Sequence, residues 1–144
     1  MATVSPEVVD NMYETGKRLV YAFDEYEEGL WAFNAVLKVE PTHLDSWIGK
    51  GVALHQLKRY DEALEAYEKA ISLNSTRAGL WSSKGSTLIK LKRYEEAIEA
   101  LDIALEIDPN YKFALYDKSE ALYALGRDAE ASELSAKADS IPWK

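Results

Sequence analysis

The sequence predicts an all-α fold, an α-solenoid of four antiparallel helix pairs with eight helices in all. Apolar residues recur three or four positions apart along most of the chain, which is the helical period. Residues 58–63, KRYDEA, return nearly unchanged as residues 92–97, KRYEEA, 34 residues later. Self-similarity at such a period is typical of stacked helical repeats. The expected connections are a few residues long, so neighbouring helices must be antiparallel.

The repeat period divides the chain into units. A lead-in at residues 1–9 precedes a divergent first repeat at 10–43, a second at 44–77, a third at 78–111 and a fourth at 112–142, all within one continuous domain, 1–144. Residues 127–140 are poor in large apolar side chains, which suits a capping end of the array. The alternative is that the chain belongs to a longer array.

Local signals place the ends of the helices. Ser5-Pro6-Glu7 has the residue types of a helix start. Thr42 and Thr76 are expected to cap the helices that follow them. Pro41 cannot continue a helix, and Gly126 suits the left-handed turn that ends one. The last helix is expected at about residues 128–140.

Residue size alternates in a fixed way within each repeat. Small residues of the first helix, such as Gly51 and Gly85, are expected to let the paired helices approach closely. Large residues of the second helix, such as Tyr67 and Leu101, are expected to fill the space left between pairs. Aromatic residues recur at two equivalent positions, which predicts a packing role in the core: Tyr13, Trp47 and Trp81 at one, and Tyr26, Tyr60 and Tyr94 at the other.

The first repeat departs from this order, because Gly16-Lys17 reverses the Lys-Gly of Lys50-Gly51. Either Gly29 makes room for the stem of Lys17, or the first helix is shifted by one residue.

These residues resemble the tetratricopeptide repeat family. The family motif is nearly complete in residues 44–77 and 78–111 and weaker in 10–43 and 112–142, and Ser75 stands where a proline is expected. The resemblance implies a right-handed superhelix whose first helices line a concave groove. It also implies a non-catalytic scaffold or adaptor that binds a peptide or helix of a partner protein in that groove.

Composition narrows the function classes. The formal net charge is −8, whereas nucleic-acid binding needs a basic surface, so no nucleic-acid partner is expected. Most acidic residues fall on second helices, so the net charge does not by itself predict a basic partner. No apolar run approaches the about 20 residues of a membrane span, and no secretory signal is visible. There is no cysteine, which fits a cytoplasmic protein.

No catalytic or metal-binding motif stands out. His43 and His55 are twelve residues apart, not the four that would bring two metal ligands together on one helix face. We therefore expect no enzymatic activity, no cofactor and no metal.

The resemblance assigns specific positions of the first helices to the groove. The candidate peptide-binding residues are Arg18, Tyr21, Ile48, Val52, His55, Ser82, Ser86, Ile89, Phe113, Tyr116, Glu120 and Tyr123. The apolar and aromatic members predict a partner with apolar or aromatic anchors. Family members that bind chaperone tails hold a C-terminal carboxylate with Lys and Asn at two of these positions, where only Arg18 is suitable here.

The aromatic residues of the fourth repeat allow other interpretations. Phe113, Tyr116 and Tyr123 could be covered by the chain's own residues 141–143 or by a second copy of the chain. The alternative function is accordingly a self-association or assembly scaffold, a homodimer formed through this aromatic face.

Overall fold

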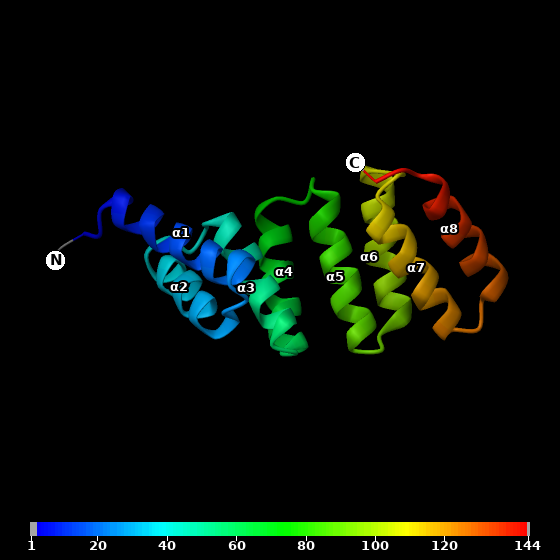
Figure 1. Cartoon of the computed structure of the whole chain (residues 1–144), viewed down its shortest axis with the longest axis horizontal. Helices are drawn as coiled ribbons and strands as arrows, with labels where there is room; N and C mark the ends of the chain where they lie inside the picture. Colours follow the sequence, from blue (N-terminus) through cyan, green and yellow to red (C-terminus); the bar gives the residue numbers. More distant parts are fainter. Residues whose placement is uncertain (1–2, 144) are drawn as a thin grey trace. The chain divides into compact units, whose positions relative to one another are not determined.

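The computed structural model describes residues 3–143, and over this range the chain forms eight α-helices and no strand (Figure 1). In chain order the helices are α1 (Pro6–Ala22), α2 (Tyr26–Val39), α3 (Leu44–Gln56), α4 (Tyr60–Leu73), α5 (Ala78–Lys90), α6 (Tyr94–Ile107), α7 (Lys112–Ala124) and α8 (Asp128–Ser140). The predicted all-α class and its helix pairs are confirmed. Met1 and Ala2 of the predicted lead-in, and Lys144, lie outside the described residues.

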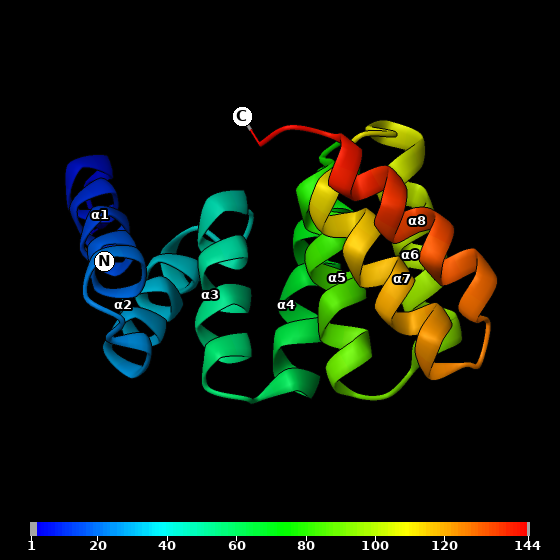
Figure 2. The same cartoon turned by 45° about the vertical axis from the view of Figure 1, so that its right-hand side comes forward.

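The chain divides into two compact units, the first ending at Leu73 and the second beginning at Asn74. In the first unit α1 packs on α2, α3 on α4, and α2 and α1 both contact α3. In the second unit α5 packs on α6 and α7 on α8, while α7 also contacts α5 and α6 (Figure 2). The single continuous domain stays a prediction. Among the described residues, no helix is long and apolar enough to cross a membrane.

Small residues of the first helix pack directly against large residues of the second helix of the same pair, whereas the sequence predicted those large residues in the space between pairs. A Cβ atom added at Gly51 would lie 2.6 Å from the ring of Tyr67, and one at Gly85 would lie 2.5 Å from Cγ of Leu101. No larger residue fits at either position without separating the two helices, because protein interiors are close-packed.

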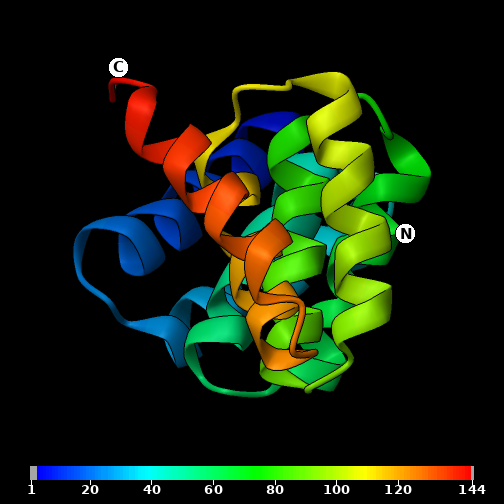
Figure 3. The ribbon, with the colours of Figure 1, turned by 90° about the vertical axis from the view of Figure 1, so that its right-hand side faces the viewer.

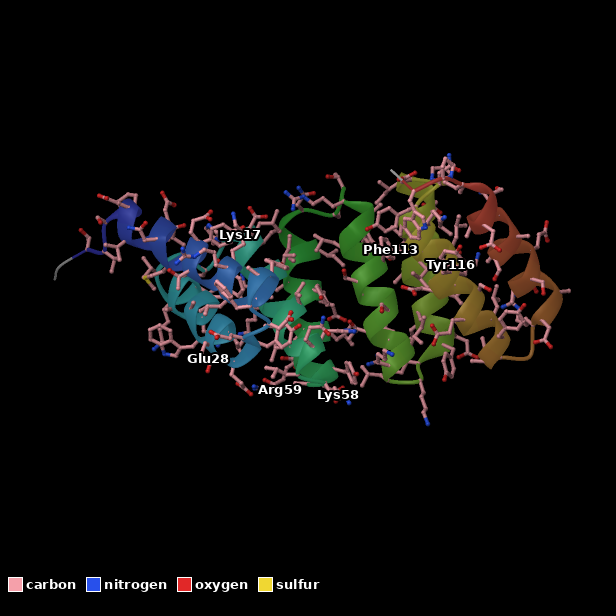
Figure 4. The ribbon with its side chains drawn as sticks, in the orientation of Figure 1. Lys17, Glu28, Lys58, Arg59, Phe113 and Tyr116 are labelled. Carbon is pink, nitrogen blue, oxygen red and sulfur yellow. The ribbon has the colours of Figure 1, made fainter. Side chains whose placement is uncertain are left out.

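The first repeat shows the same pairing, shifted by one residue. A Cβ atom added at Gly16 would lie 3.0 Å from the ring of Phe33, so Gly16 takes the place that Gly51 has in the second repeat. Lys17, labelled in Figure 4, stays at the surface, and its Nζ atom lies 2.9 Å from Oε1 of Glu14. Of the two explanations for the reversed Gly16-Lys17 order, the shifted helix is the observed one.

The fourth repeat replaces the small-to-large contact with hydrogen bonds. The hydroxyl oxygen atoms of Ser119 and Ser135 lie 2.6 Å apart. The Ser119 hydroxyl group also lies within 2.8 Å of the carbonyl oxygen of Ala131, to which it donates. Because buried polar groups need hydrogen-bond partners, this serine pair lets two small polar residues meet at a position that is apolar in the other repeats.

The recurring aromatic residues border the core and do not fill it, contrary to the prediction. Trp47 and Trp81 are half-buried. Their indole Nε1–H groups donate to the carbonyl oxygen atoms of Pro41 and Ser75, at 2.7 and 2.9 Å. An indole ring must keep its N–H group near an acceptor, which favours the edge of a core over its centre. The large side chains that are fully buried include Phe33, Leu54, Leu88, Leu101, Leu115 and Leu122.

Two of the expected helix caps are wrong. Ser5 does cap α1, since its Oγ atom accepts from the N–H group of Val8 at 3.4 Å. At α3, however, the cap is His43, whose Nδ1 atom accepts from the N–H group of Ser46 at 3.2 Å. Both α3 and α5 begin one residue later than caps at Thr42 and Thr76 would require. At α3 the imidazole nitrogen of His43 replaces the usual hydroxyl acceptor. At α5 no side chain caps the helix.

The turns inside the four helix pairs share one backbone conformation. Positive φ angles occur at Asp24 (56°), Lys58 (60°), Lys92 (59°) and Gly126 (77°), which occupy the same position in successive repeats. The predicted role of Gly126 is confirmed. In the other three turns an aspartate or a lysine adopts the left-handed conformation, which costs an L-residue about 1–2 kcal/mol.

Backbone hydrogen bonds close these turns. After α3, the N–H group of Lys58 donates to the carbonyl oxygen of His55 at 3.0 Å, and that of Arg59 donates to Leu54 at 2.9 Å. This is the Schellman pattern of helix ends, and it recurs after α5 and α7. The guanidinium group of Arg59, which is labelled in Figure 4, then lies 2.8 Å from the carboxylate of Glu62.

Candidate functional site

A hollow of about 240 Å³ lies between α5 and α7, the first helices of the third and fourth repeats. Its lining residues are Gly79, Ser82, Ser83 and Ser86 from α5, together with Tyr111, Phe113 and Asp117 from α7 and the residue before it. Figure 4 shows Phe113 on α7, where this helix begins. Three residues that the sequence assigns to a groove, Ser82, Ser86 and Phe113, therefore lie together in one unit.

The α5 side of the hollow offers hydroxyl groups that are not used in folding. Ser82 is only 5 % exposed, and its hydroxyl group has no hydrogen-bond partner among the described residues. Ser86 is half-buried and likewise has no such partner within residues 3–143. Both residues border the open hollow, so their hydroxyl groups are available to a ligand as hydrogen-bond donors and acceptors.

The α7 side carries a carboxyl group. Burial raises the pKa of Asp117 from 3.8 to about 6; the charge of Glu120 adds to the rise and that of Lys90 opposes it. Burial also raises the pKa of Tyr111, helped by the charges of Asp108 and Asp117. A carboxyl group with a raised pKa in a hollow is a candidate for binding or catalysis.

Other predicted groove residues of this unit lie elsewhere. The hydroxyl group of Tyr116 donates to Oδ1 of Asp139 at 2.6 Å, and the hydroxyl oxygen of Tyr123 lies 2.8 Å from Oγ of Ser132. Both partners belong to α8, which runs beside α7 (Figure 3). Glu120 is exposed, and Ile89 is only 6 % exposed and belongs to the core. None of these four residues lines the hollow.

Residues 141–143 lie against the start of α7, as one alternative from the sequence requires. The ring centroids of Trp143 and Phe113 are 5.3 Å apart. The Nζ atom of Lys112 donates to the carbonyl oxygen of Ile141 at 2.7 Å and lies 4.1 Å from the Trp143 ring centroid. The cover is partial, because Phe113 and Trp143 remain 57 % and 62 % exposed.

The predicted residues of the first unit lie on α1 and α3. Arg18 and Tyr21 are exposed on α1. Ile48, Val52 and His55 are half-buried on α3, and the His55 ring packs edge-on against Tyr60 with centroids 5.2 Å apart. Their role in binding stays a prediction.

Two notable residues were not predicted from the sequence, although each differs in type from the residues at the equivalent position of the other repeats. Asp117 stands where the other repeats have Thr15, Gly49 and Ser83, so a charge replaces a small uncharged residue. Trp31 is 74 % exposed and lines an apolar hollow of about 300 Å³ with Val8 and Met12. The repeats that follow have glutamate at this position, at Glu65, Glu99 and Glu133.

No group of three or more His, Cys, Asp or Glu side chains between residues 3 and 143 is arranged to hold a metal ion. The chemistry available at the hollow is thus that of one carboxyl group, several hydroxyl groups and two aromatic rings. This set can bind a ligand through ion pairing, hydrogen bonding and stacking.

Comparison with known proteins agrees with this architecture. The family model described as "Tetratricopeptide repeat" matches residues 44–77 and 78–111. No curated protein sequence matches the chain.

Several solved structures share the fold. A crystal structure of MamA has 21% sequence identity and a TM-score of 0.86, covering 93% of this chain and 78% of the MamA chain. MamA 41-end from Desulfovibrio magneticus RS-1 has 24% identity and a TM-score of 0.85, covering 91% of this chain and 73% of that one. The first TPR of Spaghetti (RPAP3), bound to the HSP90 peptide SRMEEVD, has 21% identity and a TM-score of 0.80, covering 88% of this chain and 99% of that one.

The two repeats matched by the family model are the ones in which Gly51 faces Tyr67 and Gly85 faces Leu101. The flanking helix pairs repeat the same contact in altered form, and the solved structures share the fold over nearly the whole chain. Residues 44–77 and 78–111 are therefore tetratricopeptide repeats, and the chain as a whole shares the fold of the solved structures named above.

Proposed function

We propose that the protein is a cytoplasmic, non-catalytic interaction module that binds a peptide segment of a partner protein at the hollow between α5 and α7. The tetratricopeptide repeat fold is a protein–protein interaction module, and the RPAP3 domain with this fold is bound to a peptide. The observation that carries the proposal is the convergence of Ser82, Ser86 and Phe113 on one hollow.

The ligand that we propose differs from the HSP90 peptide of the RPAP3 structure. Three of the last four residues of that peptide, SRMEEVD, are acidic, including the last one. The hollow instead contains the carboxyl group of Asp117, with Glu120 close enough to raise its pKa. Like charges brought together across an interface weaken binding, so this part of the surface disfavours an acidic chain end.

Replacing Phe113 by alanine is expected to weaken peptide binding at least about tenfold, because it removes an aromatic contact at the rim of the hollow. The ligands are peptides selected from a displayed random library for binding to the wild-type protein. Fluorescence anisotropy measures their Kd. Micromolar affinity is expected, about −8 kcal/mol. Phe113 is 57 % exposed, so the variant should remain folded.

Phe23→Ala is the matched control, since Phe23 is 64 % exposed and lies in the other unit. Ser86→Trp, which fills the hollow, should reduce affinity as Phe113→Ala does. Peptides that bind all of these proteins with equal affinity would show that the hollow is not the binding site.

A second candidate function is self-association through the fourth repeat. The supporting observation is the pair of touching, largely exposed rings of Phe113 and Trp143. Sedimentation equilibrium of the wild-type protein should then show a dimer that Trp143→Ala dissociates into monomers. A wild-type monomer at the highest concentration reached would eliminate this candidate.

A further inference from the structure

The hollow between α5 and α7 has three chemically different sides. Hydroxyl groups of Ser82 and Ser86 come from α5, the carboxyl group of Asp117 comes from α7, and the rings of Tyr111 and Phe113 stand at one end, with centroids 6.0 Å apart. Its volume of about 240 Å³ is many times the roughly 10–15 Å³ that a cavity needs to hold one water molecule. It can therefore receive a side chain.

The charges around the hollow favour a cation. The charges of Glu120 and, with the opposite sign, Lys90 act on Asp117, and Asp108 and Asp117 act on Tyr111. Lys112 is engaged elsewhere, with the carbonyl oxygen of Ile141 and the ring of Trp143. Asp117 is the acidic residue that lines the hollow. Glu120 and Asp108 add negative charge at its lining residues, and Lys90 is the cation that opposes them at Asp117.

The unpartnered hydroxyl group of Ser82 is a second, independent indication of a ligand. Ser82 is 95 % buried, being 5 % exposed, yet it lines the hollow and makes no hydrogen bond to another described residue. A hydroxyl oxygen has two acceptor lone pairs. A ligand with several N–H donors would satisfy both the serines and the carboxylate.

We propose that this hollow receives an arginine side chain of the bound peptide, whose guanidinium group pairs with the Asp117 carboxylate and donates hydrogen bonds to the hydroxyl oxygen atoms of Ser82 and Ser86. The inference rests on the proposed function and specifies its partner as a peptide with an arginine anchor. Arginine fits better than lysine because its planar group carries five N–H donors and stacks on aromatic rings, which Tyr111 and Phe113 supply.

A small-molecule probe can test this inference without the natural partner. We would titrate N-acetyl-arginine amide into ¹⁵N-labelled protein at pH 7 and follow backbone amide shifts. N-acetyl-citrulline amide has nearly the same shape but no charge. Arginine should shift the amide signals of Ser82, Ser86 and Asp117 in a saturable way, with at least about tenfold higher affinity than citrulline, because hydrogen bonds between charged groups are the stronger ones.

Asp117→Asn should lower the affinity for the arginine probe to that for citrulline. The change is isosteric and removes a carboxyl group whose ionisation is opposed by burial, so the variant should fold at least as well. Asp61→Asn on α4 removes the same charge at an exposed position and should leave arginine binding unchanged. Equal affinity for arginine and citrulline, or no effect of Asp117→Asn, would overturn the inference.

Acid should weaken arginine binding as well. The Asp117 carboxyl group, with a pKa of about 6, is mostly ionised at pH 7 and mostly protonated at pH 5. Arginine affinity should therefore fall about tenfold over this range, while citrulline affinity stays nearly constant. A flat pH profile for arginine would also contradict the inference.

This test is separable from that of the proposed function. If library peptides lose affinity for Phe113→Ala but show no arginine preference, peptide binding at the hollow is retained and the arginine anchor is wrong. If Phe113→Ala and Ser86→Trp bind those peptides like the wild type, the proposed function itself is wrong.

Discussion

Replacing Phe33 by alanine is expected to lower the free energy of unfolding by about 3–5 kcal/mol, the usual cost of removing a fully buried aromatic ring. Phe33 is 0 % exposed. Its ring lies 3.0 Å from a Cβ position built at Gly16 of α1 and 2.3 Å from one at Gly49 of α3. One side chain thus fills the space left by glycines on two different helices. Phe33→Ala would leave a cavity there, and neither glycine has a side chain that could move into it.

Urea unfolding followed by circular dichroism measures this loss. The control is Trp31→Ala, on the same helix, because Trp31 is 74 % exposed. That variant should change the free energy of unfolding by no more than about 0.5 kcal/mol. If both substitutions have similar effects, the described packing around Phe33 is incorrect.

Gly85→Leu is expected to destabilise the protein by about 2 kcal/mol, although leucine is a much better helix former than glycine. Its Cβ atom alone would lie 2.5 Å from Cγ and 2.7 Å from Cδ2 of Leu101. The helix pair of α5 and α6 must then separate or Leu101 must leave its rotamer, and both responses disturb a close-packed interface.

Gly79→Leu on the same helix is the matched comparison. A Cβ atom there would meet only the hydroxyl group of Tyr111, at 3.2 Å for the oxygen, and it points toward the hollow and not toward α6. This variant should stay within about 1 kcal/mol of the wild type. A thermal melt in which Gly85→Leu unfolds at the same temperature as Gly79→Leu would refute the close approach of α5 and α6.

Most of the fold could be predicted because the repeats agree where helices pack. Gly51 and Gly85 recur because paired helices must approach closely, although only the structure shows that they face Tyr67 and Leu101. The errors occurred where a single hydrogen bond decides a local structure. Thr42 has the right chemistry for a cap, but the imidazole of His43 accepts the bond one residue later. Trp47 recurs like a core residue, but its indole N–H group must reach the carbonyl oxygen of Pro41.

The candidate site was predicted less completely, for a related reason. Ser82, Ser86 and Phe113 were found because the family assigns their positions to the first helices' exposed face. Tyr116 shares such a position, yet in the described structure its hydroxyl group bonds to Asp139 of α8. Asp117 was missed because its position holds small uncharged residues in the other repeats. Its charge indicates a binding role only when the structure shows that Asp117 lines the hollow between α5 and α7.

The left-handed residues at Asp24, Lys58, Lys92 and Gly126 have a consequence for how the chain folds. After α3, α5 and α7, the hydrogen bonds that close the turn join residues at most five apart, so these turns can form before any contact between repeats exists. Proteins dominated by such local contacts fold fast, since little chain entropy is lost before contacts form. Folding can then begin at any of these turns and spread to neighbouring helices, as in other repeat arrays.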